Sequence, residues 1–157
     1  MSGIDPERLD FLRRNSRVHL NKEGGWTFDG KPVENDRVAQ LFHQGTRPGE
    51  APNEFVLQVG LQWCFIEFVE DTAFFLAKWR QSGGAELIGE LLGGEIVCVP
   101  PHALTRTSDT DVYATLLDGR RIRLLRDAMA GLDRWMSEQD GVLGLDVDGV
   151  FYPIPTE

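Results

Sequence analysis

Cysteine and histidine are scarce in this chain of 157 residues, which has two cysteines and three histidines. The two cysteines are far apart and form no C-x-x-C pair, which argues against a zinc site or a thioredoxin-type redox pair. Both Cys64 and Cys98 stand in apolar, strand-like runs, so we predict that they are buried small hydrophobic residues. The sequence also has no H-E-x-x-H and no G-x-S-x-G motif, and we identify no catalytic residue, metal site or cofactor.

Basic residues and long apolar runs are also in short supply. Lys and Arg number 16 against 25 Asp and Glu, giving a net charge of −9. Nucleic acids and anionic membranes are bound through Lys and Arg, so we expect neither as a partner. The N-terminus carries no signal-peptide pattern, and no apolar run has membrane-spanning length. We therefore expect a cytoplasmic protein, and the nine Phe and four Trp predict a packed core.

The chain contains one pattern twice. Each copy has an Asp-Gly turn, at Gly30 and at Gly119, which are 89 positions apart. A helix pattern follows, over residues 35–44, where Asn35 is the predicted N-cap, and over residues 126–139. An apolar hairpin pattern comes next, over residues 55–66 and 142–154. Asp29-Gly30 between alternating residues is typical of a type I′ hairpin turn.

This repetition predicts an α+β fold with mostly antiparallel sheets and two or three helices, built from two hairpin-helix-hairpin repeats. We expect an N-terminal helix in residues 1–16, a first repeat half with central strands in residues 17–104 and a second half in residues 105–157. Together these parts are expected to form one compact unit, with any pocket between the halves. Four core residues are predicted from the apolar phase of their elements: Phe65, Phe74, Leu132 and Trp135.

Two charged clusters each leave two interpretations open. Glu67, Glu70 and Asp71 follow an apolar strand and precede Phe74 and Phe75. They form either a charged turn or a set of carboxylates at the mouth of a pocket, able to bind a cation or a basic group.

The only basic cluster of the chain is the run 120–123, with Arg126 close by. Its arginines either pair with nearby acids or contact an anion such as a phosphopeptide. For His43, near the end of a predicted helix, we expect an imidazolium that interacts favourably with the helix dipole.

Three segments of the sequence resemble the bacterial DUF1285 family. They are residues 25–33 with the helix end Leu41-Phe42, the acidic and aromatic run 69–75, and the tail 143–153; the likeness covers about residues 17–155. The chain departs from the family at Ala73, where a proline is common. The resemblance implies an α+β fold with repeated structural motifs and suggests a link to signal transduction. It implies no established activity and no catalytic residue.

The preferred interpretation is a cytosolic, non-enzymatic binding or regulatory module, because no catalytic constellation is found and a sheet surface could present Trp26, Trp63 and Trp79. A first alternative is a small hydrolase or lyase that uses the three carboxylates. A second is a ligand carrier with an apolar cavity lined by Phe74, Phe75 and Trp63. The candidate binding residues are Glu67, Glu70, Asp71, Phe74, Phe75 and Trp63. The partner is expected to be a protein or a small ligand, and a homodimer is left open.

Overall fold

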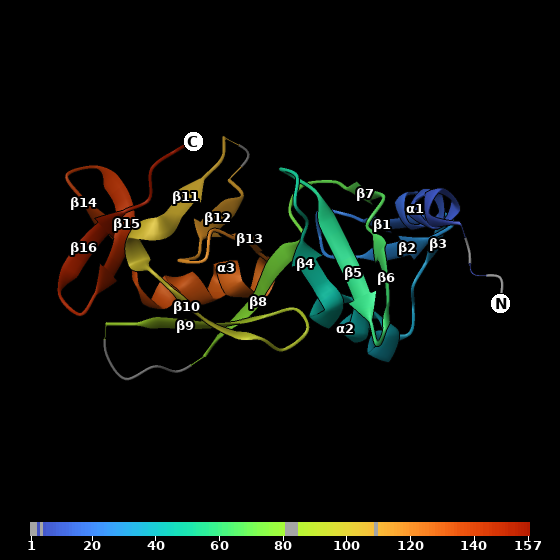
Figure 1. The fold of residues 1–157 in the computed structure, drawn as a ribbon. Coiled ribbons are helices and arrows are strands. Elements are labelled where there is room, and N and C mark those ends of the chain that lie inside the picture. Colours follow the sequence, from blue (N-terminus) through green and yellow to red (C-terminus); the bar gives the residue numbers. More distant parts are fainter. Residues whose placement is uncertain (1–2, 4, 81–84, 109) are drawn as a thin grey trace. The chain divides into compact units, whose positions relative to one another are not determined.

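The computed structural model of the protein describes residues 3, 5–80, 85–108 and 110–157, which form two compact units (Figure 1). The first unit is Met1–Ala73 and the second is Phe74–Glu157. The predicted α+β class is confirmed, since antiparallel pairings dominate the sheets and three α-helices lie within the described residues. The predicted extents of the two repeat halves stay predictions.

The first unit begins with a helix whose N-terminal end is specified by its sequence. Asp5 caps α1 (Pro6–Arg14) by accepting a hydrogen bond from the Glu7 amide, and proline occupies the first helical position. In α2 (Asp36–Gly45), Asn35 caps two amides in the same way, as the sequence predicted. The strands of this unit are β1 (Val18–Leu20), β2 (Trp26–Phe28), β3 (Lys31–Pro32), β4 (Thr46–Pro48), β5 (Phe55–Val59), β6 (Gln62–Phe65) and β7 (Phe68–Val69).

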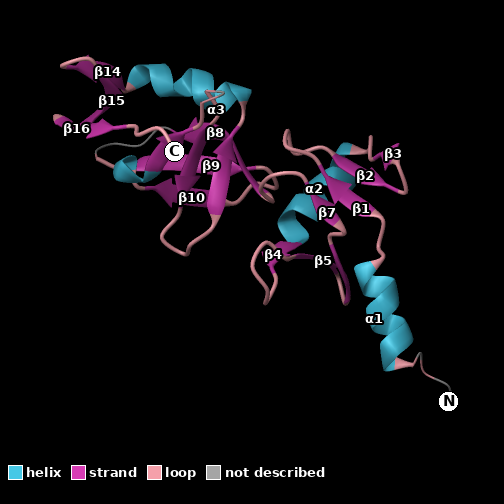
Figure 2. Cartoon of the chain, turned by 90° about the horizontal axis from the view of Figure 1, so that it is seen from above, coloured by secondary structure: helices cyan, strands magenta, loops and turns pink. Residues whose placement is uncertain are grey.

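These strands form two small sheets, in the orders β3-β2-β1-β7 and β4-β5-β6 (Figure 2). In the second of these sheets all pairs are antiparallel, and α2 packs against β5. Leu57 on β5 and Thr46 on β4 are register partners and are both buried. The opposite face of this sheet therefore carries the residues on either side of Leu57, Val56 and Gln58, because side chains alternate along a strand.

The second unit is built on a six-stranded sheet in the order β10-β9-β8-β13-β12-β11 and a three-stranded sheet β14-β15-β16. Its elements are β8 (Phe74–Arg80), β9 (Leu87–Leu91), β10 (Ile96–Val99), η1 (Pro101–Ala103), β11 (Leu104–Arg106), β12 (Val112–Thr115), β13 (Arg121–Leu124), α3 (Arg126–Gly131), η2 (Leu132–Arg134), β14 (Met136–Gln139), β15 (Val142–Val147) and β16 (Val150–Pro153). The core includes Phe75, Leu76, Ile122 and Leu124, each at most 1% exposed. They lie on β8 and β13, the central parallel pair of the sheet.

Part of each unit, β1–β7 in the first and β11 to the C-terminus in the second, connects its elements in the same order. Three strands in the spatial order β3-β2-β1 precede α2, and three in the order β13-β12-β11 precede α3. Each helix is followed by a three-stranded antiparallel sheet. In each unit, the first of the three strands before the helix also pairs in parallel with the end of the unit. In the first unit β1 pairs with β7, and in the second Arg106 of β11 pairs with Thr156. Superposition of the two copies stays a prediction.

The helix predicted over residues 126–139 is wrong in its second half. The α-helix ends at Gly131, a single 3-10 turn follows, and Met136–Gln139 forms β14. Asp140 and Gly141 both have positive φ (51° and 79°) and join β14 to β15. This pair is a hairpin signal of the same kind as Asp29-Gly30, whose φ values of 52° and 79° fit the predicted type I′ turn.

The burial predictions are confirmed in part. Phe74 and Leu132 are buried, but Phe65 and Trp135 are only half-buried, so their assignment to the core is wrong. Cys98 is exposed and Cys64 half-buried, and the prediction that both are buried is therefore wrong. The edge strand β10 buries one face only, through Val97 and Val99, and Cys98 points to the other face.

Candidate functional site

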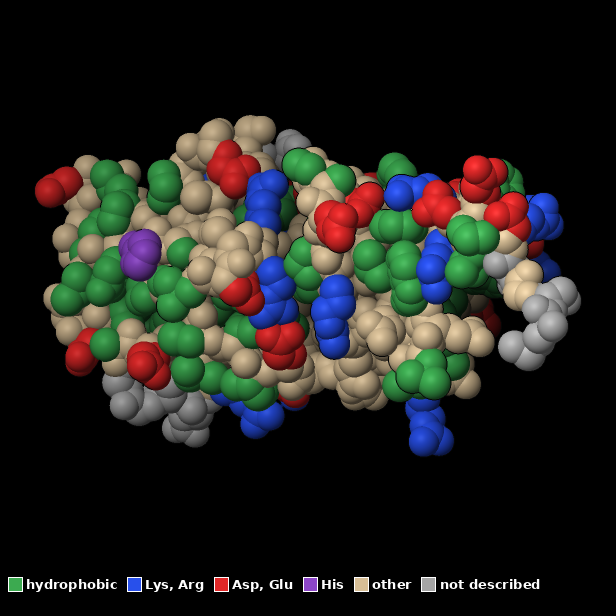
Figure 3. Space-filling view, in the orientation of Figure 1, with side chains coloured by type: hydrophobic (Ala, Val, Ile, Leu, Met, Phe, Trp, Pro, Cys, Tyr) green, Lys and Arg blue, Asp and Glu red, His purple; other side chains and the backbone are tan. Residues whose placement is uncertain are grey.

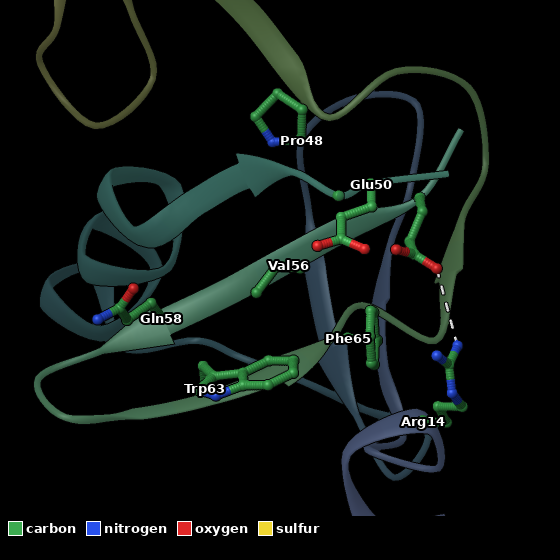
Figure 4. Close-up of a pocket in the computed structure, with 9 residues that line it drawn as sticks. Arg14, Pro48, Glu50, Val56, Gln58, Trp63 and Phe65 are labelled. Atoms are coloured by element: carbon green, nitrogen blue, oxygen red, sulfur yellow. Dashed lines mark ion pairs between the residues drawn. The ribbon is translucent and has the colours of Figure 1, made fainter. Parts of the chain in front are cut away.

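A groove of about 480 Å³ lies on the first unit, over the β4-β5-β6 sheet (Figure 4). Its floor combines Val56 and Gln58 of β5 with their register partners Phe65 and Trp63 of β6. Trp63 and Phe65 pack edge to face, with ring centroids 5.3 Å apart and an interplanar angle of 77°. All four side chains lie on the sheet face opposite the buried Leu57, so the groove does not interrupt the core. Both its size and its mixed lining are typical of ligand sites.

The loop between β4 and β5 supplies the acidic wall of this groove. Pro48, Gly49, Glu50 and Glu54 line it, and the carboxylate of Glu50 lies across the groove from Phe65 (Figure 4). The loop is closed by a 2.6 Å hydrogen bond from the Gly49 amide to the Glu54 carbonyl. Asn53 adopts a positive φ of 60°, a conformation that asparagine tolerates better than most residues. The carboxylates are therefore carried by a turn with its own backbone hydrogen bonds.

Helix α1 contributes two guanidinium groups. Arg13 Cζ lies 3.9 Å from the centroid of the Trp63 ring, and Arg14 Cζ lies 4.3 Å from that of Phe65. Arg14 also approaches Glu54 at 3.7 Å, the dashed ion pair of Figure 4, and holds Asp10 at 3.1 Å within its own helix. Charge and aromatic faces thus meet at one wall of the groove.

A second hollow of about 270 Å³ adjoins the groove and shares Arg14, Glu54 and Phe65 with it. Glu67 lines this hollow, so the structure brings two predicted site residues, Trp63 and Glu67, to neighbouring parts of one surface. The Glu67 carboxylate accepts a hydrogen bond from the Arg17 amide at 3.0 Å and lies 3.2 Å from His19 Nε2. These hydrogen bonds, the one with His19 first, lower the pKa of Glu67. A lowered pKa suits an ionised carboxylate and is opposite to what a general acid requires.

Glu70 and Asp71 lie at the surface, in the bend that follows β7. Glu70 accepts a 2.9 Å hydrogen bond from the Lys22 amide, and the Glu70 amide donates to the carbonyl of Leu20. Glu70 therefore fastens this bend to the end of β1. Neither Glu70 nor Asp71 lines the groove or its adjoining hollow.

Phe74 and Phe75 lie outside the groove altogether. They open β8 in the second unit, where they are 7% and 1% exposed. Their pairing with Ile122 and Arg123 of β13 makes them part of the central sheet. The six predicted site residues therefore divide into two on the groove surface, two in a neighbouring bend and two in a core.

The arginines of residues 120–123 are paired with acids in the second unit. Arg120 binds Glu95 through both terminal nitrogens, at 2.9 and 2.6 Å. Arg121 contacts Glu157 at 2.9 Å, and Arg123 contacts Asp111 at 3.0 Å. The face drawn in Figure 3 likewise shows acidic and basic side chains next to one another. Of the two interpretations of this cluster, the geometry favours pairing over an anion contact.

His43 has a different state from the one predicted. Burial lowers its pKa from 6.5 to about 4, although a hydrogen bond with the Gly24 backbone opposes the change. The ring is therefore neutral at neutral pH, and the prediction of an imidazolium at the helix end is wrong. Its Nε2 accepts a 3.0 Å hydrogen bond from Trp26 Nε1.

Sequence reasoning missed most of the groove. Arg13, Arg14, Glu50, Glu54 and Phe65 come from a helix, a loop and a strand, and no motif links them. One signal was available. Trp63 and Phe65 lie on one face of β6 and Cys64 on the other, just as Val56 and Gln58 lie on one face of β5 and Leu57 on the other. Two aromatic residues on one strand face, beside a proline-rich acidic loop, indicate an exposed aromatic surface.

Comparisons with known proteins identify the fold. A DUF1285 family protein from Silicibacter pomeroyi DSS-3 matches with a TM-score of 0.66 and 19% identity, over 88% of this chain and 79% of that one. A DUF1285 family protein from Shewanella baltica OS155 matches with a TM-score of 0.56 and 21% identity, over 72% and 87% of the two chains. No family model and no curated protein matches the sequence. The chain thus has the fold of solved DUF1285 proteins, in agreement with the resemblance seen in its sequence.

The described residues offer neither a cluster of metal ligands nor a helix suited to cross a membrane. In that part of the chain, no group of three or more His, Cys, Asp and Glu side chains is placed to hold a metal ion. None of the described helices combines the length and apolar character that crossing a bilayer requires.

Proposed function

We propose that this protein is a non-enzymatic binding module of the cytoplasm, of the kind used in signal transduction, and that the groove over β4-β5-β6 is its ligand surface. One observation carries the proposal: Trp63 and Phe65 are half-buried on a sheet face that the core does not use, inside a groove of about 480 Å³. Aromatic side chains are enriched at binding surfaces because they offer a large contact area with few rotatable bonds.

The alternative of a hydrolase or lyase has less support. Its three carboxylates would be Glu67, Glu70 and Asp71, and the first two accept backbone hydrogen bonds from Arg17 and Lys22. Such carboxylates hold the chain in place, and the pKa of Glu67 is lowered instead of raised. The alternative of an apolar carrier required Phe74, Phe75 and Trp63 in one cavity, but both phenylalanines are packed on β8 of the second unit.

The proposal is tested by recording amide and indole NMR spectra of the full chain while a library of small fragments is added. We expect binders to shift the Trp63 indole resonance together with the amides of Val56, Gln58 and Phe65. The variant Trp63→Leu should lose these binders, whereas Phe68→Leu, which truncates a 54% exposed ring outside the groove, should keep them. A library that shifts no groove resonance, or shifts that survive in Trp63→Leu, would contradict the proposal.

A further inference from the structure

Two guanidinium groups of the chain itself already lie on the aromatic rings of the groove. The guanidinium groups of Arg13 and Arg14 lie 3.9 and 4.3 Å from the ring centroids of Trp63 and Phe65. An aromatic ring presents a negative face, which attracts a cation and lets a planar guanidinium stack on it. The contacts of α1 therefore show that these two rings accept arginine.

The charge around the rings favours the same ligand. The groove and its adjoining hollow are lined by three carboxylates, Glu50, Glu54 and Glu67, whereas two guanidinium groups, those of Arg13 and Arg14, lie on the rings. The whole chain carries a net charge of −9. A basic partner would be attracted to this surface over a distance, and an acidic one would be repelled.

The spacing of the rings fits a peptide in extended conformation. Trp63 and Phe65 are two residues apart on β6, so their side chains leave one face of the strand about 7 Å apart. An extended peptide repeats its own side chains on one face at the same interval. Two arginines separated by one residue would thus meet the two rings in succession.

Helix α1, which carries Arg13 and Arg14, lies at the surface of the first unit. Helix α1 has no buried residue, and its Phe11 and Leu12 are 57% and 44% exposed. Arg13 forms no ion pair among the residues that the structure describes. Its contact with the Trp63 ring is weak, and the arginine of a partner can therefore replace it.

We infer that the groove binds a basic segment of a partner protein with the pattern Arg-x-Arg, whose guanidinium groups take the places of Arg13 and Arg14 on Trp63 and Phe65. This inference rests on the proposed function, because it names the partner of the same groove. Glu50 and Glu54 pair with the incoming arginines, as Glu54 now pairs with Arg14. Arg13 and Arg14 act as an internal competitor that the partner displaces.

The test measures binding of four acetylated and amidated pentapeptides to the full chain by calorimetry. They share the form Gly-X-Ala-X-Gly, with Arg, Lys, Gln or Glu as X. We expect the Arg peptide to bind more tightly than the Lys peptide, and the Gln and Glu peptides to bind at least about tenfold more weakly than the Arg peptide. Binding of the Arg peptide should weaken as salt is added, since ion pairs at an exposed surface are screened.

Variants of the chain separate a displaced competitor from a merely structural arginine. Arg13→Ala should strengthen binding of the Arg peptide because it uncovers the Trp63 ring. Glu54→Gln should weaken it, while Glu138→Gln, an exposed residue of β14, should have no effect. If the Trp63→Leu variant of the fragment experiment melts at a much lower temperature, it cannot be used with the peptides. In that case the Arg13→Ala variant still decides whether Arg13 competes with the peptide. Unchanged or weaker binding of the Arg peptide to Arg13→Ala would overturn the inference.

The outcomes also separate this inference from the proposed function. Equal binding of the Arg and Glu peptides, or fragments that bind the groove when the Arg peptide does not, would overturn the inference and leave the groove as a binding site. If the Arg peptide does not bind in calorimetry and no fragment shifts the groove resonances, both proposals are overturned.

Discussion

Trp26 and His43 are joined by a hydrogen bond in which the indole N–H donates to Nε2 of the imidazole over 3.0 Å. The two rings are also in contact, with centroids 5.2 Å apart. The bond requires the imidazole to be neutral at Nε2, because a protonated ring has no lone pair to accept with. It links β2 to α2, so the protonation state of one histidine bears on how the first unit is held together.

Burial of the His43 ring makes the stability of the first unit depend on pH. The folded-state pKa of His43, about 4, lies below its unfolded value of 6.5, so the unfolded chain binds the proton more tightly. The stabilisation is therefore complete above pH 6.5 and is lost as the pH falls from 6.5 towards 4, by up to about 3 kcal/mol. Urea unfolding at pH 7, 5.5 and 4.5 measures this loss. His43→Gln should flatten the dependence, and His102→Gln, at an exposed site, should not.

Two tryptophans of the second unit should differ in their contribution to stability. Trp79 is 8% exposed, and its indole N–H donates to the Ala128 carbonyl at 2.8 Å. Trp135 is half-buried and covers the Trp79 ring edge to face. We expect Trp79→Ala to cost about 3–5 kcal/mol and Trp135→Ala about 1–2 kcal/mol in chemical denaturation. A larger loss for Trp135 would show that its ring has a greater structural role than its exposure indicates.

Gly45, the last residue of α2, should not tolerate a side chain. A Cβ at this position would overlap the carbonyl oxygen of Gln58 on β5, a backbone atom that cannot move aside alone. Gly45→Ala should therefore destabilise the first unit by about 1–3 kcal/mol, against the usual benefit of alanine in a helix. The neighbouring Gln44→Ala changes an exposed position and serves as the control in the same thermal melts. Equal melting temperatures for both variants would mean that the strand can shift.

Arg120 should not be replaceable by lysine. Its terminal nitrogens bind both oxygens of Glu95, and its Nε binds Asp118 at 2.9 Å. A lysine keeps the charge but cannot form these parallel bonds, so Arg120→Lys should cost about 1 kcal/mol. Arg126→Lys, at an exposed site, provides the matched control. A stability for Arg120→Lys equal to that of the unchanged chain would show that charge alone matters there.

The local elements were largely predictable, whereas the site was not. Caps and hairpin turns are written in adjacent residues, and for this reason Asn35 before α2 and Asp29-Gly30 after β2 were identified correctly. The error at residues 136–139 arose from a competing signal: the apolar spacing of Met129, Leu132 and Trp135 suits a helix, but the Asp140-Gly141 turn enforces a hairpin. The groove depends on contacts between α1 and β6, and no local pattern encodes such contacts.

The two faces of β5 have different surroundings, since one packs in the core of the first unit and the other forms part of the groove floor. Leu57 faces the core, while Val56 and Gln58 face the groove. Substitutions on the groove side thus leave the packing of α2 unaffected, and the preference of the surface for a partner can change without loss of the fold. Under the proposed function, proteins with this fold can therefore bind different partners through different groove residues. A new binding specificity is best engineered on the groove side of this sheet.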